Sequence, residues 1–360
     1  MRIIFPFNKD LEKIFQLLNY NCKLVGGCVR DFILFNTLVD DIDIATPFLP
    51  FEVNDLLKSH FSIIPTGLKH GTVTIVGEKK YEITTLRKDV ETDGRHALVS
   101  FSGTTYEEDA ARRDFTMNAF YCDYSGEIFD YFDGLKDLDH GIVKFIGDPE
   151  MRIKEDFLRI LRFFRFAVRF RNADSFGLAA CLKLKEGLLT ISKERITQEW
   201  FKIINGKYFS EFFKDFLPIM DILNLKSSRK IDLIDIFNLS DLAFTSLFLN
   251  EKSLICLSNS QKKYINLLKG VSLKNQTDAN IIFNKFGEKL LNDKMILENV
   301  FFEKIKIDCV PISGQDLIDF GYMGKQIGDA LKQIEFFWYQ NFGKLSKTEL
   351  LNFYKDNYAK

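Results

Sequence analysis

Residues 24–46 read LVGGCVRDFILFNTLVDDIDIAT, and this stretch predicts a strand, a glycine turn, a short helix and a second strand. Gly26 and Gly27 allow the backbone to bend sharply and to approach a ligand closely. The helix, over about 28–35, would begin with backbone amides that have no partner inside it, which makes a ready phosphate site. Arg30 adds a positive charge in its first turn. This half of the stretch therefore predicts a phosphate-binding turn.

The second strand carries Asp41 and Asp43. Residues two apart in a strand share a face, so these carboxylates would project together while Ile42 and Ile44 face the core. Two adjacent carboxylates repel each other unless a cation lies between them, and Mg²⁺, which prefers oxygen ligands, is the usual occupant. A glycine pair or an Asp-x-Asp alone is more often an ordinary turn or a solvated strand end. Their combination is far more specific and indicates a metal-dependent site.

The bulk composition limits the classes of protein. A chain of 360 residues with 46% hydrophobic residues is long enough for several domains with sizeable cores. The net charge of −1 gives no support for a nucleic-acid partner, so any such site must be a local patch. Six scattered cysteines without a C-x-x-C pair indicate reduced thiols and a cytoplasmic protein. We find no signal peptide and no stretch of membrane-spanning length.

Two kinds of pattern divide the chain. The first 150 residues contain five of the seven prolines, and residues 72–76 and 81–87 read as a β-hairpin joined by a turn that contains Gly77. The later chain has long proline-free stretches with apolar residues at helical spacing. We therefore expect a mixed α/β head over residues 1–135 and an all-helical remainder.

Two later segments carry charged motifs. Residues 108–123 contain Arg113 and Asp114 ahead of an amphipathic run, which alone could be a salt-bridged helix start. Residues 146–170 predict one helix that begins at Pro149 and has an acidic first turn. Its apolar stripe lies opposite a polar stripe with Glu155, Asp156, Arg159, Arg162 and Arg169. Taken alone, this polar stripe is most simply a solvated face held together by ion pairs.

Together these motifs resemble the nucleotidyltransferase superfamily, in the form found in tRNA nucleotidyltransferases (CCA-adding enzymes) and bacterial poly(A) polymerases, of the bacterial type without an HD domain. The resemblance spans essentially the whole chain, is most specific over residues 22–170 and is weak over 205–310. It implies an α/β plus all-α fold. A polymerase-beta-like nucleotidyltransferase head with a mixed sheet (1–135) would precede a helical neck (136–205), a helical body (206–290) and a helical tail that binds tRNA (291–360).

The resemblance also implies roles for residues of the head. Asp41 and Asp43 would bind Mg²⁺ and act in catalysis. Glu82, on the second strand of the predicted hairpin, would be the third catalytic carboxylate, with a surface glutamate on an edge strand as the alternative. Gly27 and Arg30 would hold the triphosphate of the nucleotide. Gly26 is likewise assigned to nucleotide binding.

The remaining nucleotide contacts come from the two charged motifs. Arg113 and Asp114 would contact the phosphates and the ribose, and Arg162 and Arg165 would surround the nucleotide. Asp156 and Arg159 match the EDxxR motif that reads the base. Asp156 can accept from the exocyclic amine of cytosine or adenine, whereas uracil and guanine would present an acceptor to it. An unpaired buried polar group costs about 1–3 kcal/mol, enough for roughly tenfold to hundredfold discrimination.

Three further segments resemble family features. The polar residues 88–105 are similar to a flexible loop that switches between C and A addition, with a plain surface loop as the alternative. Residues 190–204, with Ser192 as a helix cap and Arg195 near it, resemble a structural motif of the neck. In the tail, Gly321 and Gly324 are candidates for close approach to a backbone phosphate, with ordinary turn glycines at least as good an explanation.

The function implied is template-independent addition of CMP and AMP to the 3′ end of tRNA, from CTP and ATP, without a stable protein partner. A poly(A) polymerase or an enzyme that adds only A shares these motifs and remains an alternative. A non-catalytic RNA-binding module would have lost the metal-binding carboxylates, which are present here. A nucleotidyltransferase of small molecules would lack the long helical body.

Overall fold

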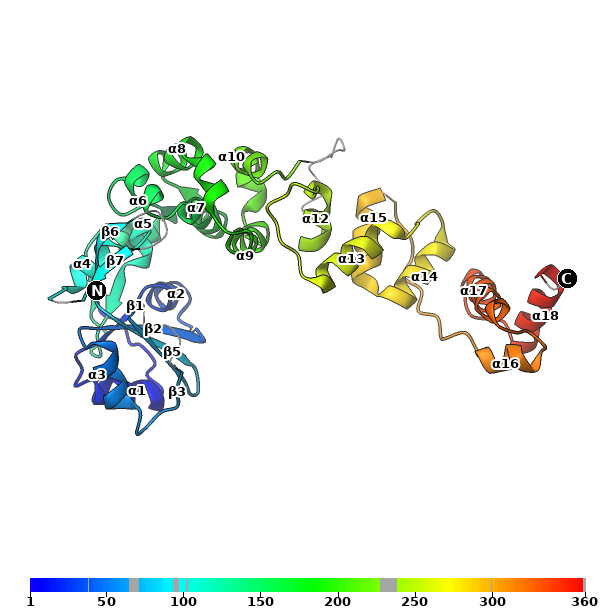
Figure 1. Cartoon of the computed structure of the whole chain (residues 1–360), viewed down its shortest axis with the longest axis horizontal. Coiled ribbons are helices and arrows are strands. Elements are labelled where there is room, and N and C mark those ends of the chain that lie inside the picture. The colour runs from blue at the N-terminus through cyan, green and yellow to red at the C-terminus, as the bar shows by residue number, and fades with distance from the viewer. Residues whose placement is uncertain are drawn as a thin grey trace. The chain divides into compact units, whose positions relative to one another are not determined.

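The computed structural model describes residues 1–37, 39–64, 71–92, 97–101, 103–226, 238–298 and 300–358, with the backbone alone for 88–92 and 97–100. The chain forms two compact units, Met1–Asn224 and Leu225–Lys360 (Figure 1). Their boundary falls inside the segment 206–290 that we expect to be the body. The finer division into head, neck, body and tail therefore stays a prediction.

A seven-stranded sheet organises the head. Its strands lie in the order β3 (Ile63–Ile64), β4 (Thr72–Val76), β5 (Lys80–Thr85), β2 (Asp41–Thr46), β1 (Lys23–Val25), β8 (Phe120–Cys122) and β9 (Ile128–Asp130). Strands β2 and β5 run parallel, and the other neighbouring pairs run antiparallel. The sheet is thus mixed, as expected, and the β4–β5 hairpin is confirmed.

Helices of the head cover this sheet and follow from local signals. They are α1 (Lys9–Leu17), α2 (Gly27–Phe35), α3 (Pro50–Leu57), α4 (Tyr106–Ala111), the 3₁₀ turn η2 (Thr116–Asn118) and α5 (Gly134–Asp139). Asn8 and Thr105 cap α1 and α4 by accepting from backbone amides. Helix α2 packs against β1, β2 and β8, while α3 packs against β4 and β5 (Figure 1). Helix α2 therefore lies against β2, the strand that contains Asp41 and Asp43.

One expectation for the head is wrong. Residues 88–105 do not form a plain loop, because β6 (Lys88–Thr92) pairs antiparallel with β7 (Ala97–Ser100) in a separate two-stranded sheet. Residues 93–96 and 102, which belong to the same predicted loop, lie outside the described residues.

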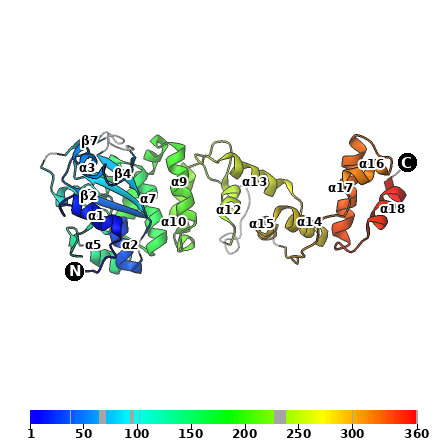
Figure 2. The same ribbon diagram turned by 90° about the horizontal axis from the view of Figure 1, so that it is seen from below.

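The helices after the head pack around aromatic side chains. They are α6 (Pro149–Glu155), α7 (Leu158–Phe170), α8 (Ser175–Lys183), η3 (Lys185–Thr190), α9 (Lys193–Ile204) and α10 (Phe209–Ile222). Helix α7 packs against both α9 and α10 (Figure 2). The apolar stripe is buried as predicted, with Ile153, Leu161 and Phe164 at 0% exposure. Stacking of Phe163 on Phe145, with ring centroids 5.4 Å apart, joins α7 to the segment that precedes α6.

Two features of this region correct the sequence reading. The single helix expected from Pro149 is two helices, since the backbone at Asp156 is extended, with φ −154° and ψ 105°. A short parallel pair, β10 (Ile142–Val143) with β11 (Asn172–Ala173), also interrupts the expected all-helical remainder.

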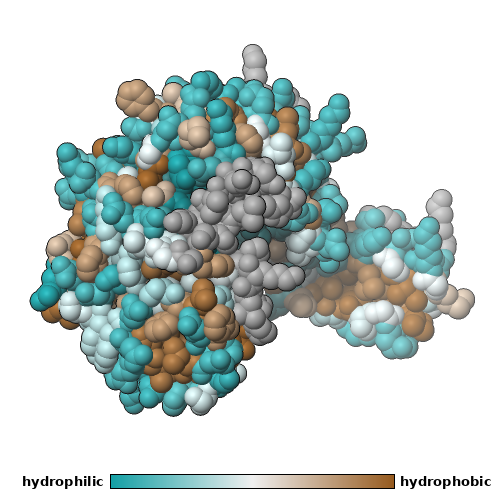
Figure 3. Space-filling view, turned by 60° about the vertical axis from the view of Figure 1, so that its left-hand side comes forward, coloured by the Kyte–Doolittle hydropathy of each residue, from teal (hydrophilic) through white to brown (hydrophobic). Residues whose placement is uncertain are grey.

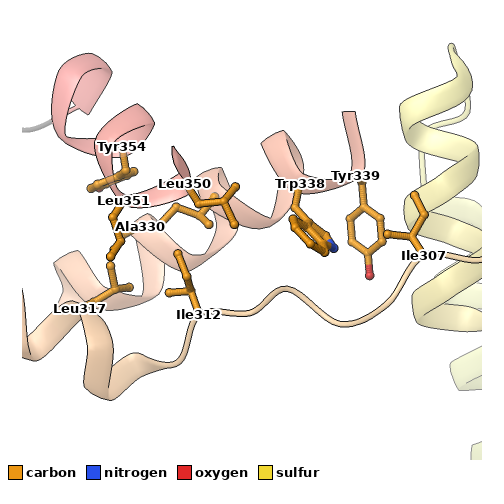
Figure 4. Close-up of a cluster of buried hydrophobic side chains, with 10 residues drawn as sticks. Ile307, Ile312, Leu317, Ala330, Trp338, Tyr339, Leu350, Leu351 and Tyr354 are labelled. Atoms are coloured by element: carbon orange, nitrogen blue, oxygen red, sulfur yellow. The ribbon is translucent and has the colours of Figure 1, made fainter. Parts of the chain in front are cut away.

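The second unit is helical, as predicted. It contains α12 (Asp241–Phe248), α13 (Asn259–Gly270), α14 (Gln276–Phe286), α15 (Glu288–Glu298), α16 (Gly314–Asp319), α17 (Lys325–Gln340) and α18 (Lys347–Tyr358). Buried residues of α16, α17 and α18, among them Leu317, Trp338 and Leu350, form one cluster with Ile307 and Ile312 (Figure 4). Gly324, with φ 55°, stands directly before α17.

The surface gives no sign of a membrane-spanning segment. Among the described residues, no helix combines the length and the apolar character needed to cross a bilayer. Figure 3 shows hydrophilic side chains over much of one face, with hydrophobic residues exposed in patches.

Candidate active site

Three carboxylates meet on the adjacent parallel strands β2 and β5. The register places Asp43 beside Glu82 and Asp41 beside Lys80. Ile42 and Ile44 are fully buried, so the aspartates lie on the opposite face of β2, as the alternation predicts. The ammonium of Lys80 lies 2.5 Å from Oε1 of Glu82 and 3.7 Å from Oδ1 of Asp41. The strand pairing thus gathers all three acids assigned to catalysis.

Negative charge at this edge is only partly compensated. The pKa of Asp43 is raised to about 6, chiefly by burial; the charge of Arg113 opposes the rise, and the carboxylates of Glu82 and Asp41 add to it. In the part of the chain that the structure describes, no three His, Cys, Asp or Glu side chains are grouped closely enough to hold a metal ion. The carboxylate of Glu82 is instead paired with the ammonium of Lys80. An oxygen donor pair with surplus negative charge fits a divalent cation at Asp41 and Asp43.

The glycine turn lies beside an arginine of the second motif. Gly26 is the N-cap of α2 and has φ 77°, a conformation that side chains rarely adopt. A Cβ at Gly26 would lie 3.1 Å from Nη1 of Arg113. The first amides of α2 begin at Gly27 and have no acceptors within the helix. The turn therefore combines helix amides with a guanidinium, a combination suited to phosphate.

Arg30 is held inside the protein. Its side chain is 4% exposed, pairs with Asp31 at 2.7 Å and donates a short hydrogen bond to Oδ1 of Asn118. Burial lowers the pKa of the Arg30 guanidinium, and Arg169 lowers it further against the attraction of Asp31. Asn118 also donates to Asp114 at 2.9 Å, so one amide connects the first motif to the second.

Asp114 is a fully engaged carboxylate. Arg162 pairs with it at 2.5 Å, and the amide of Phe115 donates to it at 2.9 Å. Burial alone would raise the pKa of Asp114, but the charge of Arg162 and the hydrogen bond from Asn118 outweigh it and lower the pKa to about 2. Asp114 therefore stays ionised and fixed, as an acceptor for a ribose hydroxyl requires.

Residues that the sequence reading missed anchor Arg113. Asp109, only 1% exposed, pairs with Arg113 at 3.2 Å and with Arg112 at 2.7 Å, and accepts from the Tyr121 hydroxyl at 2.5 Å. Arg152 donates to the carbonyls of Arg112 and Arg113, which ties this motif to α6. The i, i+4 spacing of Asp109 and Arg113 was the available signal.

The pair assigned to base reading, Asp156 and Arg159, lies at the break between α6 and α7. Oδ1 of Asp156 accepts from the amide of Leu158 at 3.1 Å, and Oδ2 accepts from Arg195 at 2.8 Å. Arg159 donates instead to Glu155 at 2.6 Å. Asp156 and Arg159 thus each have a protein partner. Arg195, which the sequence reading treated as structural, contacts the assigned base reader directly.

One polar network connects these groups. Arg113 acts on the charge of Asp43, while Arg159 and Arg162 act on that of Asp114. Arg162 in turn is influenced by Asp156. Arg165, one turn further along α7, pairs with Glu199 of α9 at 3.0 Å. Hydrogen bonds join part of this set directly, since Asn118 accepts from Arg30 of α2 and donates to Asp114, which pairs with Arg162 of α7.

Known proteins resemble this chain in sequence. The sequence profile of the poly(A) polymerase head domain matches residues 22–144. The human mitochondrial CCA tRNA nucleotidyltransferase 1 is 33% identical over 397 residues, covering 96% of this chain and 89% of that protein. The CCA-adding enzyme of Lactobacillus delbrueckii is 41% identical over 215 residues, 58% of this chain and 52% of that one.

Solved structures show the same fold over almost the full length. An apo CCA-adding enzyme matches with a TM-score of 0.72 at 19% identity, covering 97% of this chain and 96% of that chain. The Bacillus stearothermophilus CCA-adding enzyme in complex with CTP matches with a TM-score of 0.66 at 21% identity, covering 97% and 99%. The likeness to the human enzyme over nearly all of its length shows that the chain belongs to the tRNA nucleotidyltransferase family.

Proposed function

We propose that this protein adds CMP and AMP to the 3′ end of tRNA, from CTP and ATP with release of pyrophosphate, and so builds or repairs the CCA end. The observation that carries the proposal is the chain of hydrogen bonds from Arg30 through Asn118 and Asp114 to Arg162, which connects the glycine turn to the helix that follows Asp156. A site for transfer and a site for base choice then belong to one unit. The relatives named above are CCA-adding enzymes, which favours this function over poly(A) synthesis.

Transfer would take place at the carboxylates of the sheet. Nucleotidyltransferases of this family use divalent metal ions, and we propose Mg²⁺ at Asp41 and Asp43 with Glu82 as the third carboxylate. When bound, the metal would activate the RNA 3′-hydroxyl and stabilise the leaving pyrophosphate. Lys80 pairs with Glu82 at 2.5 Å, so Glu82 would have to leave Lys80 to join that site.

The nucleotide would lie between the glycine turn and the second motif. Gly26, Gly27 and Arg30 would hold the triphosphate, and Arg113, next to Gly26, would add a second guanidinium. Asp114 would accept from a ribose hydroxyl. It is already held by Arg162 and Asn118, so it would orient the sugar without moving.

Base choice would depend on the break at Asp156. An amine of cytosine or adenine would donate to Asp156, and Arg159 would donate to the adjacent ring acceptor. Both side chains have protein partners in this state, Arg195 and Glu155, so nucleotide binding would exchange or share these contacts. Arg162 and Arg165 would add positive charge around the nucleotide.

The remaining assignments concern the rest of the chain. We propose that residues 1–135, 136–205, 206–290 and 291–360 are the head, neck, body and tail, and that the tail contacts tRNA, which stays the substrate partner without a stable protein partner. The cysteines at positions 22, 28, 122, 181, 256 and 309 are all free thiols, which supports a cytoplasmic location.

A sequential incorporation assay tests the function. Purified protein is incubated with tRNA lacking its terminal CCA, first with CTP alone and then with CTP and ATP. We expect two C residues in the first step and one A in the second. Long A tails, or no C incorporation, would contradict CCA addition and would point to a poly(A) polymerase or to an enzyme that adds only A.

A further inference from the structure

A strongly basic pocket lies beside the residues assigned to the nucleotide and shares Arg30 and Arg165 with them. It has a volume of about 480 Å³ and is formed by α2, α7, the end of α9 and the turn before α10. Its lining includes the five cations Arg30, Arg165, Arg169, Lys202 and Lys207, and no acidic side chain. We call these five residues with Phe166 the basic pocket.

Two carboxylates compensate part of this charge. Asp31 pairs with Arg30 at 2.7 Å and with Arg169 at 2.9 Å. Glu199, which is 5% exposed, pairs with Arg165 at 3.0 Å and with Lys202 at 3.4 Å. Five cations and two carboxylates leave a net charge of +3 at the pocket. A compact protein leaves such an excess only where a counter-anion binds or where water screens it.

Lys207 differs from the other four cations. Among the residues with a described structure it has no ion pair, and its ammonium lies 5.0 Å from the ring of Tyr208. The side chain is exposed at the pocket edge. A ligand can therefore pair with the Lys207 ammonium without breaking an ion pair of the protein.

The lining recognises charge and not a base. The aromatic ring in the pocket, that of Phe166, already has the guanidinium of Arg165 at 4.5 Å and that of Arg30 at 5.1 Å from its centroid. Asn205 also lines the pocket, but the charged groups of the lining are all lysine and arginine donors, which suit phosphate oxygens. A backbone phosphate of RNA has this chemistry, and contacts to it are independent of sequence.

We propose that the basic pocket binds a backbone phosphate of the RNA strand whose 3′ end is extended. The inference rests on the proposed function, which makes RNA a substrate. The triphosphate of CTP or ATP carries the same phosphoryl chemistry. The pocket lining contains none of Asp41, Asp43 and Asp156. Arg30 and Arg165 are also assigned to the nucleotide, so Arg169, Lys202 and Lys207 are the cations left to hold the RNA phosphate.

The variant Lys207→Gln tests the pocket, since it removes a charge with no ion pair and so leaves no carboxylate exposed. Fluorescence anisotropy measures the Kd for tRNA lacking CCA at several salt concentrations, and calorimetry measures the Kd for CTP. We expect the Kd for tRNA to rise about fivefold and the slope of log K against log salt to fall by about one. The Kd for CTP should stay unchanged. Lys207→Arg should restore RNA binding.

The matched control is Lys193→Gln, an exposed lysine at the start of α9 that does not line the pocket. It should change neither constant, and thermal melting checks that both variants fold. Weaker CTP binding with unchanged tRNA binding would mean that the phosphate belongs to the nucleotide and would overturn the RNA assignment. Wild-type affinity for both ligands would overturn the pocket itself.

The same experiment separates this inference from the proposed function. Wild-type protein that fails to add C to tRNA would refute CCA addition, whatever Lys207 does. Wild-type protein that adds CCA, together with a Lys207→Gln variant that binds tRNA normally, would refute only the basic pocket.

Discussion

Asp43 in the sheet and Asp114 in the second motif are both largely buried, yet their pKa values move in opposite directions. The pKa of Asp43 is raised to about 6, first by burial and then by the carboxylates of Glu82 and Asp41, against the charge of Arg113. At Asp114 the same effect of burial is outweighed by Arg162 and Asn118, which lower the pKa to about 2. One site has a surplus of negative charge that an external cation can neutralise, and the other is balanced by the protein itself.

The difference contrasts a group proposed to perform chemistry with a group that holds geometry. Carboxylates that repel one another lower the stability of the folded protein, and a bound cation restores that stability. A carboxylate with a fixed guanidinium and amide contributes to folding without any ligand. Substitution of a sheet carboxylate should therefore lower activity more than stability. Substitution of Asp114 should lower stability more than activity.

The largest effect is expected for Asp41→Ala. Loss of a metal-binding carboxylate removes several kcal/mol of transition-state stabilisation, so incorporation of CMP should fall by about 10³-fold or more. The thermal midpoint should not fall, because one of the mutually repelling charges is gone. Radiolabelled CTP incorporation and thermal melting measure the two quantities, and tRNA binding should survive.

Asp40→Asn is the matched control for that variant. Asp40 precedes Asp41, and its fully exposed side chain pairs with Lys79 at 3.0 Å. An exposed pair of this kind contributes little, so activity and stability should both stay near wild type. Normal turnover in Asp41→Ala would refute the metal assignment.

The second effect concerns Asp114→Asn, which should act mainly on stability. The substitution leaves the Arg162 guanidinium without its charge partner, a loss of about 3 kcal/mol for a mostly buried pair. Denaturant unfolding measures this free energy. Glu211→Gln, which breaks an exposed pair with Arg171 at 3.1 Å, is the control and should cost almost nothing. Equal stability of the two variants would contradict the contrast between the sites.

The acid stability of the protein sharpens the same comparison. The pKa of Asp114 is about 2 in the folded protein, against an ordinary value of 3.8. Its contribution is therefore complete above pH 3.8 and is lost as the pH falls through 2, an effect of about 2 kcal/mol. We expect the unfolding free energies of wild type and Asp114→Asn to converge over this range. A constant difference down to pH 2 would show that Asp114 is not the group responsible.

Local patterns predicted the elements in which one short stretch decides the structure. The glycine turn, the helix after it and the alternation around Asp41 follow from residues within 24–46, and the structure confirms these elements. The β4–β5 hairpin is likewise local. The residues that hold the site are not local, since Arg195 lies 39 positions from Asp156 and Glu199 lies 34 positions from Arg165. No periodicity in one sequence reveals such pairs.

The break at Asp156 shows why the sequence predicts one continuous helix where the structure has two. Apolar residues continue at helical spacing from Ile153 to Phe164, so the sequence predicts one uninterrupted helix. The side chain of Asp156 instead accepts from the amide of Leu158 and from Arg195. These bonds compensate for the lost helix bonds, and this competition between side chain and backbone is invisible to a hydrophobic pattern.

The smallest effect is expected at this break, where Asp156→Ala should relax base choice more than it slows transfer. Without the carboxylate, cytosine loses its acceptor and uracil loses a repulsive contact, so the ratio of CTP to UTP use should fall about tenfold. Single-turnover incorporation with each nucleotide measures the ratio. Asp148→Ala is the control, because Asp148 caps the same α6 by accepting from Met151 at 2.8 Å and has no assigned contact with the base. It should lower stability and leave the ratio unchanged. An unaltered ratio in Asp156→Ala would mean that Asp156 holds Arg195 for structural reasons alone.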